Sequence, residues 1–183
     1  MDPTLAFWLA QGISVIAGVL AIVMLQLKNM KIILLFQILI NLIASTNYLL
    51  MDGGSGMLLS LVAIFHSIVM FFYNTKEIKP HVPVTVGFIL IYFACSIYNL
   101  VITHDPMEIL PAFAAFCFSM CLMQKKPSVF RIWAAFNPTF WLPYDIYTES
   151  YVMFMVHAGI LISSIVGMIR VDGIFKRKKQ AEE

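Results

Sequence analysis

Seven long apolar runs follow one another along the chain, separated by short polar segments. At a rise of about 1.5 Å per residue, runs of this length can cross a hydrocarbon core of about 30 Å as α-helices. The runs are continuous rather than alternating in polarity, which excludes a transmembrane β-barrel. The predicted membrane-spanning helices are Leu5–Leu27, Ile32–Met51, Met57–Tyr73, Pro83–Ile102, Met107–Gln124, Val129–Tyr147 and Tyr151–Val171.

The charged residues support this number of spans. In a seven-span model all 12 Lys and Arg residues fall on one side of the membrane. Basic residues accumulate on the cytoplasmic side of membrane proteins, so we expect the amino terminus outside and the carboxyl terminus inside. The acidic residues on the opposite side are Asp2, Asp52, Asp105, Glu108, Asp145 and Glu149.

The fourth run, 83–102, divides the chain into two similar halves. Because three runs precede it and three follow, both triplets face the same way across a bilayer, as in a parallel internal repeat. A constant offset of 97 residues aligns Ser67-Ile68-Val69 with Ser164-Ile165-Val166, and Lys28 with Lys125. We therefore predict two parallel three-helix bundles joined by a linker helix. The predicted parts of this single membrane domain, 1–183, are the first half 5–73, the linker helix 83–102, the second half 107–171 and the basic cytoplasmic tail 172–183.

The composition agrees with a membrane protein. Hydrophobic residues make up 61% of the chain and charged residues 12%, against averages of about 45–50% apolar and about 25% charged in soluble domains. Asp2 is the only charge before the first run, which has no basic leader, so we do not expect a cleaved signal peptide. We expect the lipid bilayer as the main partner and no nucleic acid, and the sequence is compatible with a homo-oligomer.

Four polar residues within the spans are the strongest candidates for a solute-binding site. Each half offers an asparagine from its second helix, Asn41 or Asn137, and a histidine from its third, His66 or His157. Polar side chains in a span usually face the bundle interior or a wet cavity. Amide and imidazole groups both donate and accept hydrogen bonds, as recognition of a neutral polar solute requires. We therefore expect all four to face one central cavity, with His66 neutral at pH 7 because its charged form is costly away from water.

Other interpretations of the same residues remain open. Asn, Ser and His also join membrane helices by hydrogen bonds, each contributing about 0.6–2 kcal/mol. Cys117 and Cys121, with Met120 and Met123, could form a soft copper site, but Cys and Met also serve as apolar filler. We expect no metal, no cofactor and no enzymatic activity, since no span combines Ser, His and an acid at useful spacing. In this interpretation Glu108 and Asp145 lie at the outer edge of the membrane.

Two short motifs, Trp8-Leu9-Ala10-Gln11-Gly12 and Glu108-Ile109-Leu110-Pro111, resemble the YgjV-like family of bacterial inner-membrane proteins. This resemblance covers nearly the whole chain and implies a location in the inner (plasma) membrane, but no settled biochemical function.

The three-one-three plan is similar in architecture to the SWEET and PQ-loop transporters, which move small solutes between two three-helix bundles. That likeness implies proline hinges in the first two helices of each half. Pro111, Pro138 and Pro143 fit it in the second half. The first two spans contain no proline, and the PQ dipeptide and the asparagine on the third helix of each half are absent.

The leading functional hypothesis is a transporter or channel for a small polar solute, with a site between the halves. The alternative is a non-transporting membrane scaffold or assembly partner in which the polar residues only join helices. A cavity lined by Asn41, Asn137 and a histidine favours the first hypothesis. A tightly packed interior with these residues paired to one another favours the second.

The charge pattern generates a prediction about topology. Reporter domains fused at Lys79, at Lys126 and at the carboxyl terminus should be active in the cytoplasm. Reporters at Gly54, Asp105 and Glu149 should be active on the outer side. A periplasmic carboxyl terminus would contradict the seven-span model.

Overall fold

Helices account for nearly all of the part of the chain that the computed structural model describes, residues 2–50, 54–78, 80, 82–147 and 151–172. These residues contain no strand, so the predicted all-α class with seven α-helices is confirmed. The elements are α1 (Pro3–Met24), α2 (Met30–Leu50), α3 (Gly54–Thr75), α4 (Val82–Thr103), the short 3-10 helix η1 (Pro106–Ile109), α5 (Leu110–Leu122), α6 (Pro127–Tyr147) and α7 (Tyr151–Arg170).

The fifth predicted helix, Met107–Gln124, is not α-helical at its start. The segment Pro106–Ile109 forms η1, and the α-helix begins only at Leu110. The Asp105 carboxylate caps η1 by accepting a hydrogen bond from the Met107 backbone N–H at 2.9 Å. Pro111 stands in the first turn of α5, where a missing N–H removes no intrahelical hydrogen bond.

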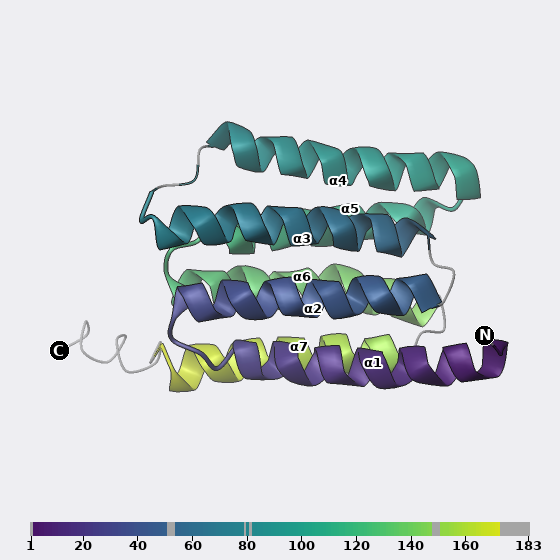
Figure 1. Ribbon diagram of the computed structural model, residues 1–183, viewed down its shortest axis with the longest axis horizontal. Helices are drawn as coiled ribbons and strands as arrows, with labels where there is room; N and C mark the ends of the chain where they lie inside the picture. Colours follow the sequence, from purple (N-terminus) through teal and green to yellow (C-terminus); the bar gives the residue numbers. More distant parts are fainter. Residues whose placement is uncertain (1, 51–53, 79, 81, 148–150, 173–183) are drawn as a thin grey trace.

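The helices form two layers with one helix at their edge (Figure 1). Helices α1, α2 and α3 pack side by side in one layer, and α7, α6 and α5 pack side by side in the other. The layers meet where α1 packs on α7 and where α3 packs on α5, while α4 covers the edge formed by α3 and α5. Between these two lines of contact the layers leave room for a cavity.

Successive helices run in alternating directions, so the loops gather at two ends of the bundle (Figure 1). The end that carries the α1–α2 and α5–α6 turns, here called the basic end, holds Lys28, Lys31, Lys125 and Lys126. The opposite acidic end holds Asp2, Asp105 and Glu108. The orientation of these ends in a membrane and the parallel internal repeat remain predictions, and residues 173–183 of the predicted tail lie outside the described residues.

The outer surface is suited to lipid. Five helices, α1, α2, α3, α4 and α7, are long and apolar enough to cross a membrane by length and composition. Helix α6 has 21 residues but is more polar, and η1 with α5 forms a shorter apolar segment. Large apolar side chains point outward, among them Phe65, Leu90 and Met155 with exposed fractions of 65%, 64% and 70%. So many exposed apolar side chains are typical of a membrane protein surface.

The tightest apolar packing lies toward the basic end. The buried cluster there includes Met24 and Leu25 from the end of α1, Ile33 and Leu34 from the start of α2, and Phe130 from the start of α6. Met70 near the end of α3 and Leu122 at the end of α5 belong to the same cluster. All of these positions are within two or three turns of the basic end, so both layers are joined there by a continuous core.

Glycines allow α1 and α7 to approach closely. A Cβ atom added to Gly18 would lie 2.8 Å from Val156, and one added to Gly159 would lie 3.1 Å from Ile22. Small residues at such positions are typical of close helix packing in membranes. Ser163 on α7 adds hydrogen bonds to this contact between α1 and α7, which we call the α1–α7 seam. Its hydroxyl donates to the Ile22 carbonyl at 2.9 Å and accepts from the Gln26 amide at 2.8 Å.

Gly167 provides a test of this seam. In Gly167→Ala the new Cβ would lie 2.7 Å from the backbone oxygen of Leu25, which cannot move without displacing the end of α1. We expect a loss of about 1–3 kcal/mol in the free energy of unfolding, measured by denaturation of the purified protein in detergent.

Gly12→Ala is the matched control, since no atom lies within 4 Å of the Cβ that it would add. It should leave stability unchanged or raise it by up to about 1 kcal/mol, because Ala favours a helix over Gly. Equal stabilities for the two variants would contradict the close approach at Gly167.

Candidate solute-binding cavity

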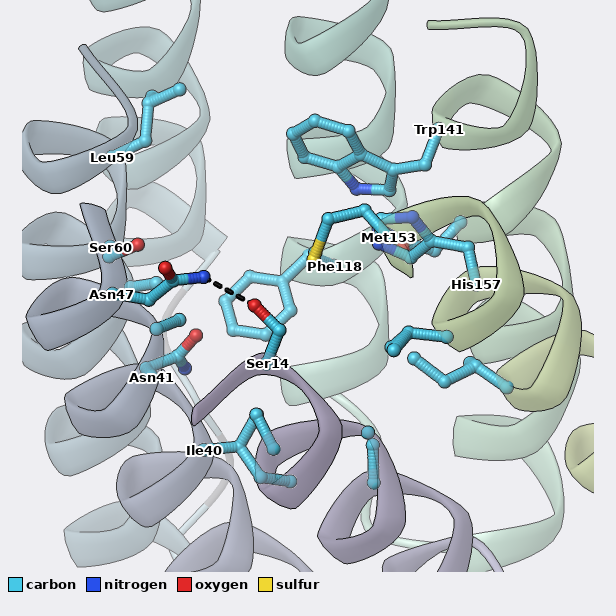
Figure 2. A pocket seen from close by; sticks show the side chains of 18 of the residues that line it. Ser14, Ile40, Asn41, Asn47, Leu59, Ser60, Phe118, Trp141, Met153 and His157 are labelled. Carbon is cyan, nitrogen blue, oxygen red and sulfur yellow. Dashed lines mark hydrogen bonds between the residues drawn. The ribbon is translucent and has the colours of Figure 1, made fainter. Parts of the chain in front are cut away.

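A cavity of about 220 Å³ lies between the two layers and is lined by residues from all seven α-helices. Figure 2 shows its wall from close by, with the amides of α2 on one side and Trp141, Met153 and His157 on the other. Most of the wall is apolar, with Phe118 and Ile160 among its larger side chains. The polar lining residues are Ser14, Gln37, Asn41, Asn47, Ser60, Tyr92, Asn137, Trp141 and His157.

The three lining asparagines are held by hydrogen bonds. The Asn47 amide donates to the Ser14 hydroxyl at 2.6 Å, as drawn in Figure 2, and Ser14 in turn donates to the Ala10 carbonyl. The Asn41 amide donates to Ser67 on α3 at a longer 3.5 Å. The Asn137 amide donates to the Ala114 carbonyl of α5 at 2.7 Å. These bonds orient the side chains, and they also join neighbouring helices.

Two buried polar atoms of lining residues have no hydrogen-bond partner among the described residues. They are Oδ1 of Asn47 on α2 and the hydroxyl of Tyr92 on α4, and Tyr92 is only 2% exposed. A buried polar group without a partner costs about 1–3 kcal/mol, so native structures contain few of them. Both atoms are shielded from the open space, so they are polar groups buried within the wall rather than groups that face the cavity.

Helix α6 supplies two polar residues of the wall, and its sequence interrupts the apolar pattern. Pro138 and Pro143 lie inside the helix. Pro138 has no backbone N–H, so the carbonyl of Ala134 one turn earlier loses its usual helical partner. Asn137 and Trp141, four residues apart on α6, both line the cavity.

The wall at His157 contains an acid–base pair. The Nδ1 atom of His157 lies 2.6 Å from Oδ2 of Asp145, and the two residues are 8% and 3% exposed. The indole of Trp141 stacks on the imidazole, with ring centroids 5.3 Å apart and planes inclined by 8°. We expected Asp145 at the outer edge of the membrane, which stays a prediction: it lies two residues from the end of α6, but it is buried there against His157 of α7.

Three of the four predicted site residues, Asn41, Asn137 and His157, line the cavity. His66 is not among the lining residues. Its ring is completely buried and stacks on Phe88 of α4 at a centroid distance of 4.1 Å, behind the lining residues Tyr92 and Phe118. Neither ring nitrogen of His66 has a hydrogen-bond partner among the described residues.

Among the predicted hinge residues, Pro111 lines the cavity, Pro138 is buried within α6 and Pro143 is exposed. Their role as hinges, and the solute-binding role of the four polar residues, remain predictions. Sequence reasoning did not propose Ser14, Tyr92 or Trp141 for the site. Ser14 and Tyr92 are polar groups within apolar runs, and that signal could have identified them.

The alternative copper site has little support in the packing. Cys117 and Cys121 are 4% and 3% exposed, and the Cys121 thiol donates to the Phe130 carbonyl at 3.6 Å. Cys121 belongs to the apolar core at the basic end. Within the described ranges, no three His, Cys, Asp or Glu residues come together as a metal site would require.

A buried arginine, Arg131, joins three segments of the chain at the basic end of the bundle. Arg131, near the start of α6, is 0% exposed, and its Nε donates to the Leu25 carbonyl at 2.6 Å. Its Nη2 donates to the Leu27 carbonyl, and its Nη1 forms an ion pair with Asp172 at 2.7 Å. The last carbonyls of a helix lack intrahelical partners and carry partial negative charge, so a cation is favourable at the end of α1.

Helices with apolar outer faces, packed around a partly polar cavity, define a multi-pass α-helical membrane protein. Comparison with family models matches residues 8–174 to the Imp-YgjV family, described as a bacterial inner membrane protein. The chain therefore belongs to this family and is a protein of the bacterial inner membrane. No curated protein and no solved structure matches the chain. The family expected from the motifs at Trp8 and Glu108 is thus confirmed, while the likeness to SWEET and PQ-loop transporters remains a prediction.

The contacts of Arg131 generate a prediction about stability. Arg131→Met removes the cation and leaves the Asp172 carboxylate and the carbonyls of Leu25 and Leu27 without it, so we expect a loss of about 3–5 kcal/mol in the free energy of unfolding. Denaturation in detergent measures the effect. The double variant Arg131→Met/Asp172→Leu should regain part of this stability, because it removes both charges together.

The control is Arg170→Met, which changes an exposed arginine at the same end of the bundle and should alter stability by no more than about 0.5 kcal/mol. If Arg131→Met behaves like this control, the buried guanidinium does not stabilise the closed basic end.

Proposed function

We propose that this inner-membrane protein is a transporter or channel for a small polar solute, which binds in the cavity between the two layers. The observation that carries the proposal is the cavity itself, which is lined by all seven α-helices and by both apolar and polar side chains. Amides, hydroxyls and an imidazole around a cavity are suited to a solute with donors and acceptors, as in other ligand sites.

The size of the cavity limits the solute. Pockets for drug-sized ligands typically measure about 300–1,000 Å³, and an apolar cavity of about 150 Å³ engineered in another protein binds benzene. At about 220 Å³, this cavity is suited to a solute of about one ring. Larger solutes, such as disaccharides, would require the layers to separate.

The chemistry of the wall indicates a neutral solute with an apolar face. None of the lining residues is Lys, Arg, Asp or Glu, and the titratable ones are Tyr92 and His157. Amide and hydroxyl groups can recognise donors and acceptors on the solute, while Phe118 and Trp141 can pack against its apolar face. Charged solutes would lack a compensating charge on the lining side chains.

The two ends of the bundle differ in a way that suits transport. Toward the basic end the layers are joined by the apolar core and by Arg131, so passage in that direction requires this end to open. The predicted parallel halves would move relative to each other, with Pro111, Pro138 and Pro143 as places where the second half bends. This role binds and moves a solute and involves no catalysis.

The alternative is a non-transporting scaffold. The observation in its favour is that the amide groups of Asn41, Asn47 and Asn137 all donate to protein acceptors and so join helices. In that case the cavity is a packing defect, and filling it should be neutral or stabilising.

A cavity-filling variant distinguishes the two functions. Ala44 lines the cavity and is partly exposed to it, so Ala44→Phe places a ring of about the size of the expected solute in this space. The wild-type protein should be stabilised by one or more solutes in a thermal-shift screen of monosaccharides, pyrimidine bases and lactams. Ala44→Phe should lose at least about tenfold in affinity for that solute, a difference of about 1.4 kcal/mol.

Ala94→Phe is the matched control, because Ala94 is exposed on the outer face of α4 and the same ring would point toward lipid. It should retain the full response. No response to any solute in the wild-type protein, together with unchanged or increased stability of Ala44→Phe, would favour the scaffold.

A further inference from the structure

The pair formed by Asp145 on α6 and His157 on α7 differs from every other polar contact of the cavity wall. It joins an acid to a base, at 2.6 Å, and both residues are more than nine-tenths buried. Isolated charges in a membrane interior are expensive, and ionisable residues there are typical of ion and proton pathways. The other buried ion pair, Arg131–Asp172, lies at the basic end and joins helix ends rather than lining the cavity.

The geometry leaves one nitrogen of His157 available. An ionised carboxylate only accepts hydrogen bonds, so Nδ1 of His157 carries the hydrogen that faces Asp145. The other nitrogen, Nε2, makes no hydrogen bond to any described residue, and His157 lines the cavity. Trp141 stacks on the ring and holds its plane. The free nitrogen of a neutral imidazole is a proton acceptor.

The surroundings of the pair contain no competing cation among the described residues. On α6 the next residue before Asp145 is Tyr144, whose hydroxyl donates to Glu108 of η1 at 3.1 Å. Helix α5 carries no charged residue, and the only charge on the amino-terminal side of α1 is Asp2 at its cap. On α7 the nearest charge is Arg170, more than three turns away. Among the described residues, the charged group in contact with His157 is therefore Asp145.

The pair also lies in the half of the bundle nearer the acidic end, which the cavity reaches as well. Asp145 is two residues from the end of α6, and Glu108 belongs to the short helix that precedes α5 at the same end. His157 is one and a half turns into α7, beside the cavity. A proton could thus reach His157 from the acidic end and meet a solute on its other side.

We infer that the Asp145–His157 pair is a proton-binding site on the cavity wall, and that the proton is the coupling ion of the transporter. The coupling rests on the proposed function, whereas proton binding does not. The step is balanced without any further reactant. Nε2 of His157 accepts a proton from hydronium on one side of the membrane, the imidazolium is compensated by the Asp145 carboxylate, and the proton later returns to water on the other side.

Proton binding can be measured through Trp141. A protonated imidazole stacked on an indole places a cation over the face of the indole ring, and this changes the fluorescence of the indole. Replacing Trp8 and Trp133 by Phe leaves Trp141 as the single tryptophan of the purified full chain. Between about pH 4.5 and about pH 8.5 its fluorescence should show a one-proton transition. The transition should be lost in His157→Gln. In Asp145→Asn proton binding should weaken about tenfold, because the compensating charge is gone.

His104→Asn is the control: His104 is exposed between α4 and η1, and Asn tolerates its positive φ of 55°. It should leave the transition unchanged. If His157→Gln does not fold, NMR of the wild-type protein labelled with ¹⁵N at histidine provides the test. The signal of the His157 imidazole should then show the gain of one proton over the same pH range. Absence of that signal, or a fluorescence transition that persists in His157→Gln, would overturn the site.

Coupling is measured in proteoliposomes that contain the wild-type protein and the pH dye pyranine. Addition of a monosaccharide, pyrimidine base or lactam that is taken up should move protons in the same experiment, and His157→Gln should lose this proton movement. Uptake of a radiolabelled solute without proton movement would overturn the coupling and leave the transporter intact. No uptake of any of these solutes would count against the proposed function, and the Trp141 titration would still decide whether the pair binds a proton.

Discussion

The buried guanidinium of Arg131 determines how the basic end of this protein is built. A cation inside an apolar bundle is stable only where several acceptors surround it. Arg131 finds them in the carbonyls of Leu25 and Leu27, just after α1, and in Asp172 beyond α7, so three segments far apart in the chain meet at one side chain. Gly167 makes room for it, since a Cβ there would lie 2.9 Å from Cδ of Arg131. The closed basic end and the α1–α7 seam both depend on this contact.

Because the layers are joined so firmly at one end, the space between them appears farther along the helices. The apolar core occupies the basic end, and on α6 the cavity begins at Asn137, next to Pro138 inside the helix. The same side chains therefore have two roles. Asn47 and Asn137 join neighbouring helices through their amide donors, and they also form part of the cavity wall.

The two buried histidines illustrate how environment decides the chemistry of a side chain. His66 packs on Phe88 as an aromatic ring, and its nitrogens meet no polar group among the described residues. His157 has a carboxylate on one nitrogen and an indole on its face, and it borders the cavity. Both lie within an apolar span, yet of the two only His157 borders the cavity.

The sequence alone determined the class of this protein and the number of its helices. A membrane helix satisfies its backbone hydrogen bonds within itself, so run length and apolar content are enough to predict it. Polar residues within the runs also identified Asn41, Asn137 and His157 as candidates. Only the tertiary structure decided which polar groups meet, because one residue turns a helix by about 100° and depth in the membrane does not specify a face. In the tertiary structure His66 lies behind the cavity wall, packed on Phe88. Asp145 is buried against His157 of α7, and Arg131 points into the bundle toward Leu25.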